Sequence, residues 1–295
     1  MTTFALDQLP SQSGRTVVVT GATSGIGRVT AEVLAARGAR VVLAVRDVDK
    51  GRAAARAMVG DVAVRPLDLA DLASVRAFAT GLAEPVDVLV NNAGVMVPPL
   101  SRTVDGFELQ LGTNHLGHFA LTNLLLPRVR ERVVTVSSNG HRFGAIDFAD
   151  LNWEHRRYRP LAAYGQSKLA NLLFTTELQR RLTAAGSPVI AVAAHPGMAS
   201  THLLSERRGA RHLLHRVSVP VAQSAEDGAL PTLYAAVADV PGDSYAGPSG
   251  FLEGRGAPTL VGRSARARDT AVARRLWDVS EALTGTTFPA ELAVR

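Results

Sequence analysis

The chain alternates between short apolar runs and longer segments whose apolar residues recur with the helical period of about 3.6 residues. The apolar, β-branched runs predict strands at residues 16–20, 40–45, 61–65, 86–91, 131–137, 188–194 and about 249–252. Helical periodicity predicts helices at residues 26–37, 48–58, 71–82, 104–127, 161–185 and 224–237. Strands separated by helices are typical of a parallel sheet covered on both faces. We therefore expect an α/β fold with one doubly wound parallel sheet of about seven strands, in a single domain over residues 1–295.

A glycine-rich turn follows the first predicted strand. The strand leads directly into Gly21-Ala22-Thr23-Ser24-Gly25-Ile26-Gly27, and a helix follows this turn. Glycines allow the backbone to approach a pyrophosphate closely, and the helix N-terminus attracts its negative charge. The spacing Gly-x-x-x-Gly-x-Gly is a variant of the dinucleotide-binding fingerprint. A tight structural turn is the competing interpretation, but the flanking strand and helix favour dinucleotide binding.

The second predicted strand ends at Val45-Arg46-Asp47. An acidic residue at the end of this strand would bind the ribose 2′-hydroxyl and select NAD, but Val45 occupies that position. The guanidinium of Arg46 suits a 2′-phosphate because it can donate two hydrogen bonds to it, so the sequence favours NADP(H) over NAD(H). Two alternatives stay open: Asp47 could bind the ribose, or Arg46 could be a solvated surface charge. Asp47 could also cap the next helix.

Tyr164 and Lys168 are four residues apart in a predicted helix, which places them on one face, one turn apart. A nearby ammonium favours the phenolate form, so the phenol could exchange protons closer to neutral pH. Apart from Lys50, Lys168 is the only lysine among 32 basic residues, so an otherwise arginine-biased chain keeps a compact ammonium here. Taken alone, the pair would be read as the surface of an amphipathic helix.

Together with further motifs, the chain resembles the short-chain dehydrogenase/reductase family, which has a Rossmann-type fold. The motifs, in the family's order over about residues 15–200, are Asn91-Asn92-Ala93-Gly94, Asn114 in Thr113-Asn114-His115-Leu116-Gly117, Val136-Ser137-Ser138 and His195-Pro196-Gly197. Three segments are similar to the retinol-dehydrogenase-like and WW-domain-oxidoreductase-like branch. They are Ala44-Val45-Arg46-Asp47, Asp150-Leu151-Asn152 and Tyr164-Gly165-Gln166-Ser167-Lys168-Leu169-Ala170-Asn171.

The resemblance implies a catalytic set of Asn114, Ser138, Tyr164 and Lys168. Ser138 would donate a hydrogen bond to the substrate oxygen, with Ser137 as its rival, and Tyr164 would be the general acid in reduction and the general base in oxidation. Lys168 would lower the pKa of Tyr164 and hold the nicotinamide ribose, and Asn114 would hold a water in the proton relay. The implied cofactor-binding residues are Gly21, Thr23, Ser24, Gly25, Ile26, Gly27, Arg46, Asp68, Leu69, Asn91, Ala93, Gly94, Tyr164, Lys168, Pro196, Gly197 and Thr201. Asp68 could alternatively cap the helix near Leu72.

Two segments bear on the substrate. Residues 139–160 lengthen the interval between Ser138 and Tyr164, and their aromatic residues predict a flap beside the substrate mouth. Residues 200–220 combine leucines with basic residues, and in the resembling family this region is a mobile substrate lid. Such a basic amphipathic segment could also lie on a membrane. The apolar residues of both segments point to a lipophilic alcohol, aldehyde or ketone as substrate.

Composition narrows the classes further. The absence of cysteine excludes disulfides and thiolate metal sites, and no metal site is predicted. The net charge of +6 could attract nucleic acid, but the basic residues are scattered and not interleaved with aromatics, so no nucleic-acid partner is expected. Neither an apolar stretch of about 18 residues nor a secretion leader is visible, so we expect a cytoplasmic protein without a transmembrane segment.

The sequence therefore predicts an NADP-dependent short-chain alcohol dehydrogenase or carbonyl reductase that acts on a small-molecule carbonyl or alcohol. Its assembly into a homo-oligomer is left open. The alternative is a non-catalytic dinucleotide-binding regulatory protein on the same fold, because a fold does not determine a function. A regulatory protein would need the glycine turn but not the residues Asn114, Ser138, Tyr164 and Lys168, so their presence favours the enzyme.

Overall fold

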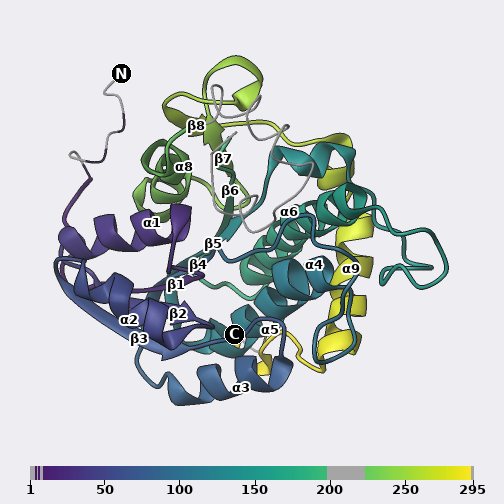
Figure 1. The fold of residues 1–295 in the computed structure, drawn as a ribbon, viewed down its shortest axis with the longest axis horizontal. Coiled ribbons are helices and arrows are strands. Elements are labelled where there is room, and N and C mark those ends of the chain that lie inside the picture. The colour runs from purple at the N-terminus through teal and green to yellow at the C-terminus, as the bar shows by residue number, and fades with distance from the viewer. Residues whose placement is uncertain (1–3, 5, 7–8, 198–222, 294–295) are drawn as a thin grey trace.

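The computed structural model describes residues 4, 6, 9–197 and 223–293. Its centre is an eight-stranded sheet with the strand order β3-β2-β1-β4-β5-β6-β7-β8 (Figure 1). The strands are β1 (Thr16–Thr20), β2 (Arg40–Val45), β3 (Asp61–Pro66), β4 (Val86–Asn91), β5 (Val129–Val136), β6 (Ile190–Ala194), β7 (Tyr245–Pro248) and β8 (Pro258–Leu260). The first seven strands are parallel and β8 pairs antiparallel with β7, so the predicted parallel sheet is confirmed and carries one further, antiparallel strand.

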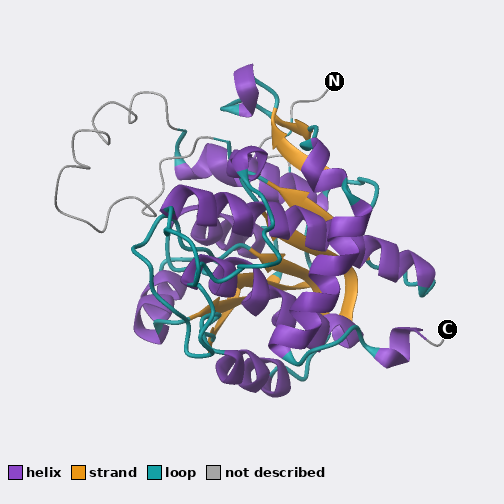
Figure 2. Cartoon of the chain, turned by 90° about the vertical axis from the view of Figure 1, so that its right-hand side faces the viewer, coloured by secondary structure: helices purple, strands orange, loops and turns teal. Residues whose placement is uncertain are grey.

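Helices cover both faces of this sheet, as Figure 2 shows with the strands in orange between layers of purple helices. The helices are α1 (Gly25–Ala36), α2 (Val48–Arg56), α3 (Leu72–Gly81), α4 (Leu109–Leu111), α5 (Gly117–Leu125), α6 (Pro160–Ala184), α8 (Ala225–Val237), α9 (Thr270–Thr284) and α10 (Ala290–Ala293). Strand side chains alternate between the two faces. Val17 and Val19 of β1 pack with α1 and α8, whereas Val18 packs in the cluster that includes α3, α5, α6 and α9.

Two predicted elements differ in the structure. The predicted helix 104–127 is divided, because α4 has only three residues and is followed by a π-helical turn, Gly112–Leu116, before α5 begins. The predicted strand near 249–252 is wrong, because the seventh strand is Tyr245–Pro248 and the chain then enters a 3₁₀ turn, Phe251–Glu253. Leu252 and Glu253 have φ angles of 51° and 53°, a left-handed conformation that cannot continue a strand.

The parallel topology brings distant parts of the sequence to one edge of the sheet. The glycine turn follows β1, Asn91 ends β4, Ser138 follows β5 and His195 follows β6. The carboxyl ends of parallel strands lie at the same edge, which is where ligands bind in open α/β sheets. The sheet thus places the residues singled out in the sequence around one common site.

Candidate active site

The glycine turn between β1 and α1 is shaped for close backbone approach. Gly21 and Gly25 have φ angles of 67° and 55°, and a Cβ atom on Gly21 would lie 2.8 Å from the Cβ of Ala93. Ser24 is the N-cap of α1, but its side chain makes no capping hydrogen bond, and the first turn of α1 contains no acidic residue. The backbone N–H groups at this helix end are therefore available to an anion, and a dinucleotide pyrophosphate fits the turn.

The segment after β4 lies against the glycine turn. The backbone N–H groups of Asn92 and Ala93 each donate a 2.9 Å hydrogen bond to the Thr20 hydroxyl at the end of β1. Asn91 is fully buried, and its amide donates to Thr122 of α5 at 2.8 Å. A Cβ atom on Gly94 would lie 3.1 Å from Asn114 Oδ1 and 3.5 Å from Lys168 Nζ. Gly94 therefore lies between the glycine turn and the helix that carries the Tyr164–Lys168 pair.

The residues predicted to choose the cofactor lie at the ends of β2 and β3. Arg46 is exposed, and it makes no hydrogen bond or ion pair with any residue that the structure describes. Asp47 Oδ1 accepts a 3.0 Å hydrogen bond from Lys50 N, so Asp47 caps α2, and this bond lowers its pKa. Asp68 is half-buried and accepts from Ala70 N at 2.9 Å.

The other residues of this region have structural contacts. Asp71, not Asp68, is the N-cap of α3, so the capping role considered for Asp68 is wrong. Leu69, the neighbour of Asp68, is buried, and its carbonyl group faces Gly117 at the start of α5. Asp68 therefore lies just after β3, at the carboxyl edge of the sheet, and does not cap a helix.

Ser138, Tyr164 and Lys168 lie together at the carboxyl end of β5. Burial raises the pKa of Tyr164, and a hydrogen bond with Ser138 opposes that rise. Lys168 is almost wholly buried, and its Nζ donates to the Val136 carbonyl at 3.1 Å and lies 5.7 Å from the centre of the Tyr164 ring. Burial lowers the pKa of Lys168 to about 8. Ser137, the rival of Ser138, is buried and donates to the Lys168 carbonyl at 2.8 Å.

Asn114 lies in the π-helical turn that interrupts the predicted long helix. Its side-chain oxygen accepts from Val95 N at 2.7 Å, and its amide donates to the Val95 carbonyl at 3.0 Å and to Ser167 Oγ at 2.9 Å. The side chain thus joins the segment after Gly94 to α6. Its own carbonyl lies 3.1 Å from Nδ1 of His118, a residue that the sequence reasoning missed. The signal was present, since His118 follows Asn114 by one helical turn.

The segment after β6 is described only up to residue 197. Gly197 has a φ angle of 67°, and the Pro196 carbonyl accepts a 3.1 Å hydrogen bond from Gln223, which also donates to the Gly254 carbonyl at 2.9 Å. Thr201 and the predicted lid 200–220 lie outside the described residues.

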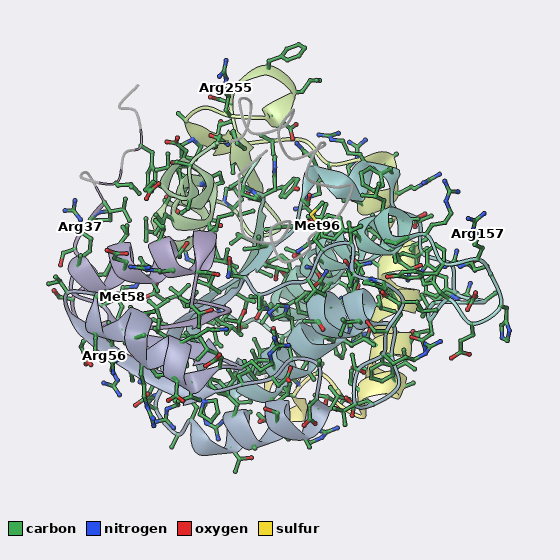
Figure 3. The ribbon with its side chains drawn as sticks, viewed as in Figure 1. Arg37, Arg56, Met58, Met96, Arg157 and Arg255 are labelled. Carbon is green, nitrogen blue, oxygen red and sulfur yellow. The ribbon has the colours of Figure 1, made fainter. Side chains whose placement is uncertain are left out.

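The predicted flap, residues 139–160, begins as a 3₁₀ turn, Asn139–Phe143, and continues as a loop to α6. Figure 3 shows Arg157 at the outer part of this loop, away from the body of the molecule. The loop is held at its base, because the Tyr158 hydroxyl donates to the buried carboxylate of Glu108 at 2.9 Å. A Cβ atom on Gly140 would lie 3.1 Å from the Tyr164 ring and 3.3 Å from the Phe143 ring, so Phe143, 56% exposed, lies beside Tyr164.

Comparison with known proteins identifies the class to which this fold and site belong. The family model described as short chain dehydrogenase matches residues 15–212, and the chain belongs to this family. It is therefore an oxidoreductase of a family that binds nicotinamide dinucleotides and acts on small molecules.

Within the family, the chain falls in the retinol-dehydrogenase-like branch. It is 45% identical to human retinol dehydrogenase 13, over 94% of this chain and 86% of that protein. A solved structure of an uncharacterized protein from Mycobacterium paratuberculosis is 57% identical and covers 98% of this chain and 100% of its own, with a TM-score of 0.87. A second structure, from Beutenbergia cavernae, is described as an NAD(P)-dependent gluconate 5-dehydrogenase with bound NADP. It is 28% identical over 77% of this chain and 91% of its own, with a TM-score of 0.60.

Proposed function

We propose that residues 1–295 form one NADP(H)-dependent oxidoreductase domain that transfers a hydride between nicotinamide and the carbonyl or alcohol carbon of a lipophilic small molecule. The observation that carries this proposal is the hydrogen bond of a buried Tyr164 with Ser138, with Lys168 Nζ 5.7 Å from the centre of the Tyr164 ring and next to Gly94. A bound nicotinamide would supply or accept the hydride, and the protein residues would position the substrate and move its proton.

Tyr164 is the proposed general acid in reduction and general base in oxidation, and Ser138 would donate a hydrogen bond to the substrate oxygen. Burial raises the pKa of Tyr164, so its phenol is neutral at physiological pH and can give its proton to a carbonyl oxygen. Lys168 lies within the same buried region and would stabilise the phenolate that remains. Asn114 joins this region to the backbone of Val95 and would hold the relay water predicted from the family.

The glycine turn and Arg46 support the proposed NADP(H) specificity. Arg46 is exposed at the end of β2 with a free guanidinium among the described residues, and Asp47 is committed to capping α2. These positions suit a 2′-phosphate better than a bare ribose. The residues proposed to hold the cofactor are Gly21, Thr23, Ser24, Gly25, Ile26, Gly27, Arg46, Asp68, Leu69, Asn91, Ala93, Gly94, Tyr164, Lys168, Pro196, Gly197 and Thr201.

The proposed substrate is lipophilic, because Phe143 presents an exposed apolar surface beside Tyr164. The name of the human relative, retinol dehydrogenase, points to a lipophilic alcohol as well. Within residues 4, 6, 9–197 and 223–293, no helix combines the length and the apolar character needed to cross a bilayer. Action in the cytoplasm and assembly into a homo-oligomer stay predictions.

The proposed chemistry is tested with a panel of lipophilic aldehydes, ketones and alcohols, including retinal and retinol, by following the absorbance of NADPH. Wild type should turn over at least one of them, and Tyr164→Phe should lose roughly 10²–10⁴-fold in rate while it still binds NADPH. Tyr234→Phe, at a half-buried tyrosine of α8, is the matched control and should keep wild-type rates. Wild-type turnover by Tyr164→Phe would instead favour the regulatory alternative.

Cofactor choice is tested separately by titrating NADPH and NADH. Wild type should prefer NADPH, and Arg46→Ala should lose affinity for NADPH but not for NADH, because only NADPH carries the 2′-phosphate. Arg56→Ala removes another exposed arginine from the end of α2 and should change neither affinity. Equal affinities for both cofactors in wild type would contradict the proposed specificity.

A further inference from the structure

His118 is a buried titratable residue that the proposed mechanism does not use. It lies on α5 with 1% of its surface exposed. Its Nδ1 lies 3.1 Å from the backbone carbonyl of Asn114, and its Nε2 lies 2.9 Å from the hydroxyl of Thr20. One imidazole therefore connects the π-helical turn that carries Asn114 with the end of β1, where the glycine turn begins.

The partners of the ring determine where its hydrogen lies. A carbonyl oxygen can only accept, so Nδ1 must carry the hydrogen and donate to Asn114. Burial, with a smaller effect of the charge on Lys168, lowers the pKa of His118 to about 4, so the ring is neutral. In a neutral ring protonated at Nδ1, Nε2 has a free lone pair, and it accepts from the Thr20 hydroxyl.

The bond to His118 also fixes the direction of the Thr20 hydroxyl. Thr20 Oγ1 accepts the backbone N–H groups of Asn92 and Ala93, which uses both of its lone pairs. The hydroxyl donates its single hydrogen to His118 Nε2, which lies 2.9 Å from Oγ1. The other possible acceptor, the Val90 carbonyl oxygen, is farther away, at 3.4 Å. A continuous series of hydrogen bonds thus runs from the Asn92–Ala93 turn through Thr20 and His118 to Asn114.

Each end of this series meets a part of the candidate site. At one end, the Asn114 side chain holds the Val95 backbone on both its N–H and its carbonyl group, next to Gly94 and Lys168. At the other end, Ala93 lies against Gly21 of the glycine turn. A shift of His118 would therefore displace both Asn114, the proposed proton-relay residue, and the Asn92–Ala93 turn, which is part of the surface proposed to hold the cofactor.

We propose that His118 is a positioning residue that holds Asn114 through its Nδ1 hydrogen and holds the Asn92–Ala93 turn through Thr20 at its Nε2. This inference rests on the proposed function of the site. The two hydrogen bonds of His118, here called the arm to Asn114 and the arm to Thr20, can be removed separately. An asparagine amide falls near the position of Nδ1, and a glutamine amide falls near the position of Nε2. His118→Asn thus keeps the arm to Asn114, His118→Gln keeps the arm to Thr20, and His118→Leu keeps neither.

The two arms predict different kinetic changes. In His118→Leu, kcat should fall and the KM for NADPH should rise, each about tenfold, because small displacements of positioned groups are costly in a catalytic site. His118→Asn should restore kcat but leave the KM for NADPH high. His118→Gln should restore the KM but leave kcat low. The measurement is steady-state kinetics with NADPH and the best substrate of the panel.

His115 provides a matched control, because it is also a buried, neutral histidine beside Asn114. Its Nε2 lies 2.9 Å from Ser280 of α9, and burial lowers its pKa to about 3. We expect both His115→Leu and His118→Leu to lower the stability to urea, but His115→Leu should leave kcat and the KM for NADPH near wild type. Equal losses in all three His118 variants, or wild-type kinetics in His118→Leu, would overturn the positioning role.

A failure of the positioning role of His118 can be distinguished from a failure of the proposed function. If wild type reduces no substrate of the panel, the proposed chemistry fails, but NADPH affinity can still be titrated. The positioning role then requires weaker NADPH binding in His118→Asn than in His118→Gln, and equal affinities of the two variants would reject it.

Discussion

At the scale of single residues, burial acts in opposite directions on the two members of the Tyr164–Lys168 pair. It raises the pKa of the tyrosine and lowers that of the lysine, because a low-dielectric environment disfavours both charged forms. The sequence predicts a lysine that lowers the pKa of its tyrosine, whereas in the structure burial has the largest effect on each. The Lys168 ammonium has one hydrogen-bond partner among the described residues, the Val136 carbonyl.

This burial predicts a pH-dependent stability that can be assigned to Lys168. Its folded-state pKa of about 8 is below the ordinary value of 10.5, so the unfolded state binds more protons between these values and stability rises with pH. At about 1.36 kcal/mol per pKa unit, the free energy of unfolding should gain on the order of 2 kcal/mol from about pH 8 to about pH 10. Urea unfolding of wild type and Lys168→Met measures this gain, which only wild type should show.

Tyr164 serves as an internal check in that experiment. Its folded-state pKa is raised above 10.0, so it binds more protons in the folded state and lowers stability only as the pH rises past 10. The interval below pH 10 therefore isolates the contribution of the lysine. An identical pH dependence in wild type and Lys168→Met would show that the ammonium of Lys168 is well solvated.

At the scale of elements, the sequence predicted those features that depend on local pattern. The first six strands and the glycine turn were found because apolar runs and glycine spacing are local signals. The division of helix 104–127 was not found, because the π-helical turn is set by contacts of Asn114 with Val95 and Ser167, which are distant in sequence. The turn at Leu252 was missed for the same reason, since its carbonyl accepts from Asn139 and the adjacent Glu253 pairs with Arg142.

The predicted flap is an element whose attachment could not be seen in the sequence. Tyr158 donates to Glu108 and accepts from Gln110, both at 2.9 Å, and Glu108 N donates to Asn152 Oδ1 at 2.9 Å. Glu108 is completely buried, although nothing in the sequence around it predicts a buried carboxylate. The base of the flap is therefore fixed to the segment that leads into α4.

Removal of the Tyr158 hydroxyl should loosen the flap. Tyr158→Phe deletes the hydrogen bonds to Glu108 and Gln110 and leaves a buried carboxylate with one partner fewer, which costs about 1–3 kcal/mol. We expect lower stability in urea and faster amide hydrogen exchange in residues 144–159, and Tyr234→Phe should show neither change. Unchanged exchange in the loop would mean that Trp153, packed under Arg156 at 3.7 Å, is its main anchor.

At the scale of the whole molecule, α9 extends the core on one face of the sheet. Figure 1 shows this helix in yellow alongside α6. Trp277 of α9 is 2% exposed, and its ring stacks on Phe174 at 5.7 Å and meets Phe119 edge-on at 4.8 Å between ring centres. Asp269 caps the start of α9, and Gly285 ends it with a φ angle of 59°. These two residues are the sequence signals from which the helix could have been predicted.

The position of α9 predicts that a change in this helix lowers the stability of the protein without weakening NADPH binding. Trp277→Ala removes a buried indole from between α6 and α5 and should lower the free energy of unfolding by about 3–5 kcal/mol. Because Trp277 packs on Phe119 of α5 and Phe174 of α6, and neither residue is among those proposed to hold the cofactor, NADPH affinity of the folded fraction should stay near wild type. Leu161→Ala, at a side chain that is 56% exposed, is the control and should cost far less stability. A large loss of NADPH affinity in well-folded Trp277→Ala would show that α9 also supports the site.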